Sequence, residues 1–164
     1  MFARSGTAWA QEAQLLAADG APGDFFGHSV SLDGDTLLVG AIHDDDAGAD
    51  SGSAYVFERT GTTWAQTAKL VAAGVGAGDS FGFAVSLHGD TAVISAPRDD
   101  DFGIEAGAVY VFERAGTVWG APVELRAFDG FAYDLFGISV ALSGDTLLVG
   151  SYLDDAKGPE SGSA

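Results

Sequence analysis

The 164-residue chain contains no cysteine, only four prolines and only seven lysines and arginines, against 24 acidic residues. Without cysteine, the sequence excludes disulfides, cysteine-based zinc sites and thiol nucleophiles. The net charge of −17 repels nucleic acid and anionic membranes, and it attracts cations or a basic partner. No apolar run is long enough to span a bilayer. We therefore expect neither nucleic-acid binding nor membrane insertion.

The sequence does contain a threefold internal repeat with a period of 55 residues. Three kinds of marker share this register: single tryptophans, Phe-Gly pairs and Gly-Asp-Thr triplets. They begin at Trp9, Trp64 and Trp119, at Phe26, Phe81 and Phe136, and at Gly34, Gly89 and Gly144. A fixed period of this size indicates modules that bury their apolar faces against one another. We expect one array over 1–164, in units of approximately 1–54, 55–109 and 110–164.

Each unit is predicted to form four antiparallel strands. In the middle unit, 82–87 alternates apolar and polar residues, and a glycine turn leads into the apolar run 91–96. A third strand at 107–113 is rich in β-branched and aromatic residues. The element that begins at each tryptophan has good helix formers in the first unit. In the third unit, larger apolar residues alternate with other residues over 119–125, and Pro122 lies among them. Both features favour an outermost strand over a helix.

Four-stranded sheets repeated radially are the blades of a β-propeller. The Phe-Gly pair, the Tyr-Val-Phe strand and a Gly-Ala-Pro-like segment resemble the FG-GAP repeat of integrin α-subunit propellers and many bacterial surface proteins. That segment occurs as Gly40-Ala41-Ile42, Ser95-Ala96-Pro97 and Gly150-Ser151-Tyr152. The resemblance covers essentially the whole chain. It implies an all-β propeller that is a non-enzymatic binding or scaffolding module of an extracellular or cell-surface protein. A carbohydrate-binding, lectin-like propeller is the alternative, and a propeller enzyme is the third interpretation.

The two ends of the sequence fall within one strand of the repeat. Residues 1–4 align with 56–59, and residues 161–164 align with 51–54. One blade is therefore expected to be split between the N- and C-terminal segments, an arrangement that removes exposed sheet edges. Three blades are fewer than a usual ring contains, so we expect a homodimer in which two chains join head to tail into a six-bladed ring. An excised piece of a longer repeat protein is the alternative.

Acidic residues gather at two places in every unit. The clusters between the second and third strands supply the candidate metal ligands Asp44, Asp45, Asp46, Asp50, Asp99, Asp100, Asp101, Glu105, Asp154, Asp155 and Glu160. A further acid precedes each Phe-Gly pair, at Asp24, Asp79 and Asp134. Both connections are expected on the same side of the disc, where converging carboxylates suit Ca²⁺. The alternative, favoured for the second set, is that the acids make turns and cap backbone amides.

Two further patterns bear on the expected site. The integrin-type calcium loop has alternating aspartates between the first and second strands, whereas the short turn 33–35 and its counterparts occupy that place here. Calcium is therefore expected in the loops between the second and third strands. The histidines occupy non-equivalent positions, so no repeated histidine ligand set exists. Arg4, Arg59 and Arg114 recur at the end of the third strand and are expected to pair with nearby acids.

Overall fold

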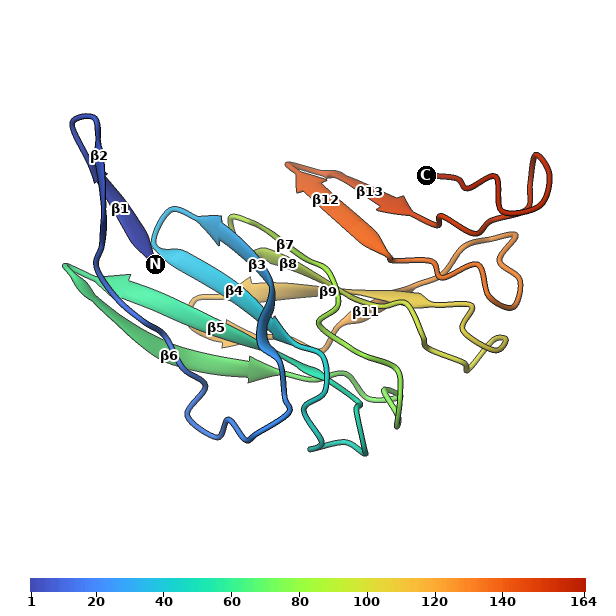
Figure 1. Ribbon diagram of the computed structural model, residues 1–164, viewed down its shortest axis with the longest axis horizontal. Coiled ribbons are helices and arrows are strands. Elements are labelled where there is room, and N and C mark those ends of the chain that lie inside the picture. Colours follow the sequence, from blue (N-terminus) through green and yellow to red (C-terminus); the bar gives the residue numbers. More distant parts are fainter.

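The computed structural model describes residues 1–164 and contains thirteen β-strands and no helix (Figure 1). The chain forms a hairpin, two complete sheets and a second hairpin. The first hairpin and sheet consist of β1 (Phe2–Ser5), β2 (Ala8–Gln11), β3 (Phe26–Asp33), β4 (Thr36–Ala41), β5 (Ser53–Thr60) and β6 (Thr63–Leu70). The second sheet and hairpin consist of β7 (Val85–His88), β8 (Thr91–Ala96), β9 (Ala108–Ala115), β10 (Val118–Trp119), β11 (Val123–Leu125), β12 (Ser139–Ser143) and β13 (Thr146–Gly150). The structure has no helix that could cross a membrane.

All strand pairs within the sheets are antiparallel. The first complete sheet has the order β3-β4-β5-β6, and the second has β7-β8-β9 with both β10 and β11 on the outer edge of β9. The outermost strand is thus confirmed, and the helix alternative is wrong. In the second sheet this strand is interrupted between Trp119 and Val123. Pro122 lies in the gap, where its missing N–H cannot contribute to the ladder.

A two-residue turn joins the first two strands of every repeat. Its first residue is Gly34, Gly89 or Gly144, with φ of 56°, 57° and 55°, respectively. Glycine adopts this left-handed backbone without the clash that a Cβ would cause. The turn gives the three hairpins the same register, because it is closed by the pairs Asp33↔Thr36, His88↔Thr91 and Ser143↔Thr146.

The first strands of successive repeats lie side by side, since β3 contacts β7 and β7 contacts β12. An equivalent hydrogen bond links each pair of neighbouring repeats. The N–H of Leu87 donates to Ser31 Oγ, and one repeat later the N–H of Leu142 donates to Ser86 Oγ, both at 3.0 Å. One kind of inter-repeat interface is therefore built twice along the chain.

The main hydrophobic core lies between the two complete sheets, where Leu38 and Val56 of the first sheet meet Ile94 of the second sheet and Phe81 of the connection that precedes β7. All four side chains are fully buried. Strands β4 and β8 are almost wholly buried, as their apolar sequences predicted. Strand β13 has a similar sequence but leaves Leu148 56% exposed, because no following sheet covers that face of the hairpin.

Candidate functional site

The long connections lie along one edge of the array, and the tight turns lie along the opposite edge (Figure 1). On the long-loop edge, the loop after the second strand of one repeat contacts the loop before the first strand of the next. Backbone N–H groups donate to backbone carbonyls there, in the pairs Gly78–Ala49 (2.9 Å), Phe81–Ser51 (2.8 Å), Tyr133–Ile104 (2.7 Å) and Phe136–Ala106 (3.0 Å). Both acidic sets are thereby brought to the same edge, which we call the loop edge.

The first acid of each predicted metal-binding cluster is buried. Asp44, Asp99 and Asp154 are only 3%, 2% and 5% exposed. In each of them Oδ1 accepts a hydrogen bond from the backbone N–H two residues later, as in an Asx turn. The second carboxylate oxygen accepts a hydrogen bond from a tyrosine hydroxyl in two of the repeats. Tyr55 donates to Asp44 at 2.7 Å, and Tyr110 donates to Asp99 at 2.8 Å. These carboxylates therefore organise their own loops.

The other members of the clusters differ in their roles. Asp45 and Asp155 accept the backbone N–H five residues later, from Asp50 at 2.8 Å and Glu160 at 2.6 Å. In contrast, Asp46, Asp100 and Asp101 are exposed, and Glu105 is half-buried. Asp50, Glu105 and Glu160 share a left-handed backbone with φ of 50–55°. In the first two of these, the carbonyl accepts an N–H from the next repeat.

The acids before the Phe-Gly pairs anchor their loops. Asp24, Asp79 and Asp134 are buried, and in each of them Oδ2 accepts the N–H of the residue three positions earlier. The donor–acceptor distances are 2.7, 2.6 and 2.6 Å. This geometry is the turn-making alternative that the sequence favoured for these three positions.

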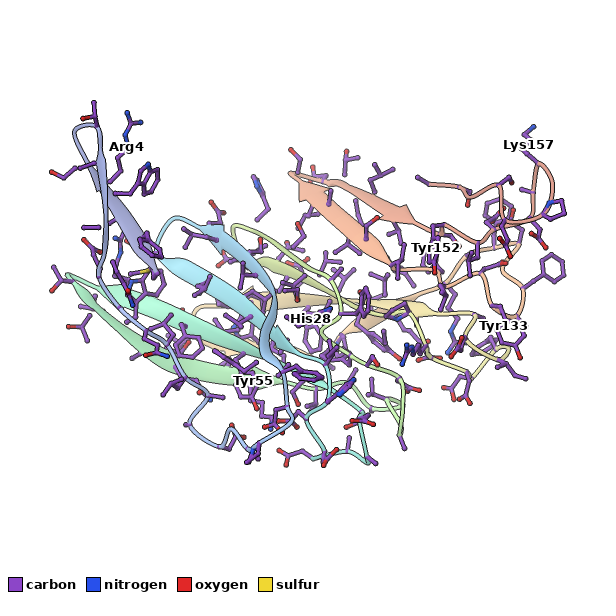
Figure 2. The ribbon with its side chains drawn as sticks, in the orientation of Figure 1. Arg4, His28, Tyr55, Tyr133, Tyr152 and Lys157 are labelled. Carbon is purple, nitrogen blue, oxygen red and sulfur yellow. The ribbon has the colours of Figure 1, made fainter.

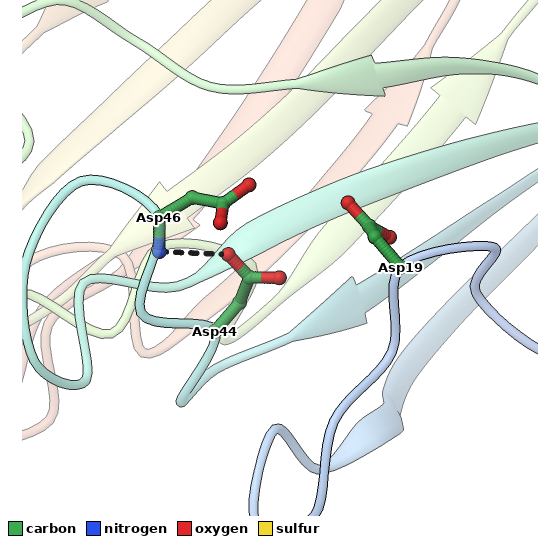
Figure 3. A group of neighbouring side chains, drawn as sticks. All are labelled: Asp19, Asp44 and Asp46. Carbon is green, nitrogen blue, oxygen red and sulfur yellow. Dashed lines mark hydrogen bonds between the residues drawn. The ribbon is translucent and has the colours of Figure 1, made fainter.

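One group of carboxylates has the spacing of a metal site, because ligand oxygens of Asp19, Asp44 and Asp46 lie within 4.8 Å of one another (Figure 3). The ammonium group of Lys69 already pairs with all three, at 2.8, 2.9 and 2.5 Å, respectively. It also lies 5.2 Å from the centre of the Tyr55 ring. This site therefore contains an internal cation.

Neither Asp19 nor Lys69 was identified from the sequence. Their counterparts one repeat later are Gly74 and Glu124, so the repeat pattern gave no signal for either residue. The lysine also changes the protonation of its neighbours. Burial alone raises the pKa of Asp44, but hydrogen bonds from Tyr55 and Lys69 outweigh it and hold that pKa below the ordinary range. Burial lowers the pKa of Lys69, yet the three carboxylates raise it overall.

The third repeat contains a comparable acidic cavity of about 140 Å³ without a lysine. Asp129, Asp134, Asp154 and Asp155 line it together with Phe131. Asp129 and Asp154 are the counterparts of Asp19 and Asp44, 110 residues later in the sequence. The structure thus brings two predicted ligands, Asp154 and Asp155, together with two other carboxylates.

Asp79 provides a pH-dependent feature of the loop edge. Burial raises its pKa from the ordinary 3.8 to about 6, and the charges of Asp99, Asp100 and Asp101 add to the rise. The folded chain therefore binds a proton between about pH 4 and pH 6 that the unfolded chain releases. The stability contributed by this proton is complete below about pH 4, and it is lost as the pH rises through 6.

We expect Asp79→Asn to remove this part of the pH dependence, because an amide does not titrate. The amide oxygen can still accept the hydrogen bond from the Gly76 N–H. Urea unfolding from pH 4 to pH 8 should show a smaller loss of stability for the variant than for the natural chain. A parallel loss in both proteins would assign the titration to other groups.

The recurring arginines pair with acids at the turn edge in two repeats, as predicted. Arg59 Nε lies 2.7 Å from Asp35 Oδ1, and Arg114 Nε lies 2.9 Å from Asp90 Oδ1. The same guanidinium groups lie over the rings of Trp64 and Trp119, at 5.5 and 5.3 Å from the centroids. Those two tryptophan faces are therefore occupied and not open for sugar stacking. Trp9 is 66% exposed and has no such cover.

Comparison with known families agrees with the repeated geometry. A family model described as FG-GAP repeat matches residues 9–57, 64–112 and 119–164, each match beginning at a repeated tryptophan. A search of curated proteins finds no match. FG-GAP repeats are typical of extracellular or surface proteins. The matches cover most of the sequence in the 55-residue register of its internal repeat, and the chain belongs to the FG-GAP repeat family.

Proposed function

We propose that the chain is a non-enzymatic, propeller-type binding module of an extracellular or surface protein, with the loop edge as its binding surface. The observation that carries this proposal is the gathering of acidic loops from all three repeats along one edge. Exposed Asp45, Asp100, Asp155 and Glu160 present negative charge there, and few basic side chains offset it. Such an edge attracts ligands of positive charge, and the attraction weakens as salt is added.

We further propose that the repeats are arranged as propeller blades, and that two copies join head to tail into a six-bladed ring. The contacts of β3 with β7 and of β7 with β12 support this arrangement, because inner strands line the centre of a propeller. The two hairpins supply the outer half and the inner half of a split blade. A ring has no open end, so it would cover the sheet faces that the single chain leaves exposed.

The binding surface can be tested with an oligolysine peptide as a cationic probe. The loop-edge variant Asp100→Asn/Glu105→Gln and the turn-edge variant Asp35→Asn/Asp90→Asn remove equal charge. We expect the natural chain to bind the peptide in a salt-dependent way, and the loop-edge variant to bind it several-fold more weakly. Equal weakening by the two variants would mean that net charge, rather than the loop edge, attracts the peptide.

Calcium is the cofactor we propose for the loop edge, in support of its structure. The acidic cavity of the third repeat is lined by carboxylates from two connections and by no lysine, a setting that suits a hard cation. The proposal predicts a higher melting temperature in millimolar Ca²⁺ than in chelator. An unchanged melting temperature would argue against calcium at every one of the acidic loops.

The lysine-filled cluster gives a second calcium test. Replacing Lys69 with methionine leaves Asp19, Asp44 and Asp46 without their cation, and we expect a loss of about 2 kcal/mol in stability. Millimolar Ca²⁺ should restore part of this loss, because the three carboxylates then offer a vacant oxygen site. Lys157→Met, in the exposed C-terminal loop, is the control for the stability loss measured in chelator. A loss in Lys69→Met that calcium leaves unchanged would show that these carboxylates cannot hold the ion.

A further inference from the structure

We propose that the apolar groove beside β3 and β4 is the seat of the β12–β13 hairpin of a second copy, and that β1 of one copy adds to the open edge of β13 of the other. The inference rests on the proposed head-to-tail assembly and specifies its strand register. It commits to a second copy because the two surfaces involved lie at opposite ends of the same array (Figure 1), and each lacks what the other offers.

The groove has a volume of about 600 Å³ and is mostly apolar. One wall comes from the first sheet and includes Phe26, Val30, Leu32, Leu37 and Val39. The other wall comes from the N-terminal segment and includes Met1, Ala13 and Leu15. Val30 and Leu32 are 65% and 59% exposed, although they point from a strand that pairs within a complete sheet. This face lacks a neighbouring sheet.

The interface between the two complete sheets shows what covers such a face. Val85 and Leu87, the counterparts of Val30 and Leu32 one repeat later, are only 9% and 6% exposed. They belong to the same buried cluster as Leu38 of the preceding sheet. Both walls of the groove have counterparts in this cluster, since Ala13 and Leu15 correspond to Ala68 and Leu70. In the interface between the two complete sheets, β3 and β4 also cover Val85 and Leu87. The groove lacks an equivalent pair of strands over Val30 and Leu32.

That missing pair of strands is present at the other end of the array. β12 and β13 are the counterparts of β3 and β4, and Leu148 of β13 corresponds to Leu38. Leu148 is 56% exposed, whereas Leu38 is fully buried. Seating β12–β13 of a second copy in the groove would therefore place Leu148 against the same kinds of residue that bury Leu38. Apolar burial on both sides supplies the driving force.

The open edge of β13 fixes how β1 would pair with it. In the first sheet, β4 pairs with β5 in the register Leu37↔Phe57 and Thr36↔Glu58. The counterpart pairs join Leu147 and Thr146 of one copy to Phe2 and Ala3 of the second copy. The start of this third strand is already present, because Ser163 exchanges two backbone hydrogen bonds with Ser151, at 3.0 and 2.9 Å. Strand addition would continue that pairing.

Charges at the turn edge agree with the same register. Asp145 is the counterpart of Asp35 and Asp90, each of which holds the arginine that ends the third strand. Arg4 is the corresponding arginine, but within its own chain it donates only to the Gly6 carbonyl. Figure 2 places Arg4 on the N-terminal hairpin, far along the array from Lys157. In the proposed register, Arg4 of one copy meets Asp145 of the other.

One inter-repeat hydrogen bond would be absent at this junction. Ser31 and Ser86 each accept a backbone N–H from the next repeat, and their counterpart in the third repeat is Ala141. Apolar packing, strand pairing and the Arg4–Asp145 contact would hold the junction without it.

Engineered disulfides test the register directly, because the chain has no cysteine of its own. Phe2→Cys/Leu147→Cys places the two thiols opposite each other across the junction, within the range of a disulfide. Phe2→Cys/Leu148→Cys is the matched control, since adjacent strand residues point to opposite faces. Mild oxidation should convert most of the first variant, and little of the control, into a covalent dimer on a non-reducing gel. Equal crosslinking of both variants, or crosslinking of the control alone, overturns the register.

Charge exchange provides the second measurement. Arg4→Asp and Asp145→Arg should each weaken self-association by about tenfold, because a ring contains the contact twice, and the double variant should recover most of that loss. A natural chain that stays monomeric overturns both the ring and this inference. A natural chain that dimerises with no response to either charge reversal or to the cysteine pairs overturns the register alone and leaves the head-to-tail ring standing.

Discussion

Replacing Gly52 with alanine is expected to destabilise the chain by about 3–5 kcal/mol, from left-handed strain and from overpacking against main chain. Gly52 has φ of 83°, and a Cβ built there would lie 2.1 Å from the Phe81 carbonyl oxygen and 2.6 Å from the Phe81 nitrogen. Both obstructing atoms are backbone, so no side chain can rotate away. The Phe81 N–H donates to the Ser51 carbonyl at this contact, and the alanine would therefore push neighbouring repeats apart.

Gly61→Ala is the control that separates the cost of a left-handed backbone from the cost of crowding against main-chain atoms. Gly61 has a similar left-handed backbone, with φ of 63°, but no atom lies within 4 Å of the position that an alanine Cβ would take there. This control should cost only about 1–2 kcal/mol. Urea unfolding of the two variants measures the difference. Equal losses would show that the close approach of the Gly52 backbone to Phe81 contributes nothing to stability.

Phe81→Ala is expected to cost about 3–5 kcal/mol, the usual range for removing a buried aromatic ring. Phe81 is fully buried between the two complete sheets, and its ring makes edge contacts with Tyr110 and Phe112, at centroid distances of 5.4 and 6.3 Å. The substitution removes these contacts and leaves a cavity between the two sheets. Thermal or urea unfolding would measure the loss.

Phe26→Ala is the matched control for Phe81→Ala. Phe26 makes the same aromatic contacts one repeat earlier, with Tyr55 at 5.5 Å and Phe57 at 5.9 Å. It is only half-buried, because no sheet precedes it in the single chain. In dilute solution its loss should be about half that of Phe81→Ala. At concentrations that favour self-association, the two losses should converge. A Phe26 cost equal to that of Phe81 in a proven monomer would contradict the packing described here.

The period of the sequence was sufficient to predict the strands. Alternation and β-branched residues located β7, β8 and β9, and Pro122 correctly favoured a strand over a helix. The limits of the elements were less predictable. The interruption between β10 and β11 depends on how far the ladder tolerates a missing N–H. The exposure of β13 depends on which strands cover it, and no local pattern contains that information.

The sequence was sufficient to place the acidic loops, but not to predict the contacts that their carboxylates make. Repetition correctly identified the acidic loops and their common edge. It could not show that the carboxylate oxygens of Asp44 and Asp99 accept hydrogen bonds from Tyr55, Tyr110 and backbone N–H groups. It also missed Lys69, a residue present in one repeat alone. Contacts between loops are tertiary, so side chains that occur once become visible only in the folded chain.

The solution mass of the purified chain, measured by light scattering over a range of concentrations, tests the central claim most directly. If two copies close one ring of FG-GAP blades, the mass should reach twice the 16.7 kDa of the single chain and rise no further. A mass of 16.7 kDa at every concentration would contradict it.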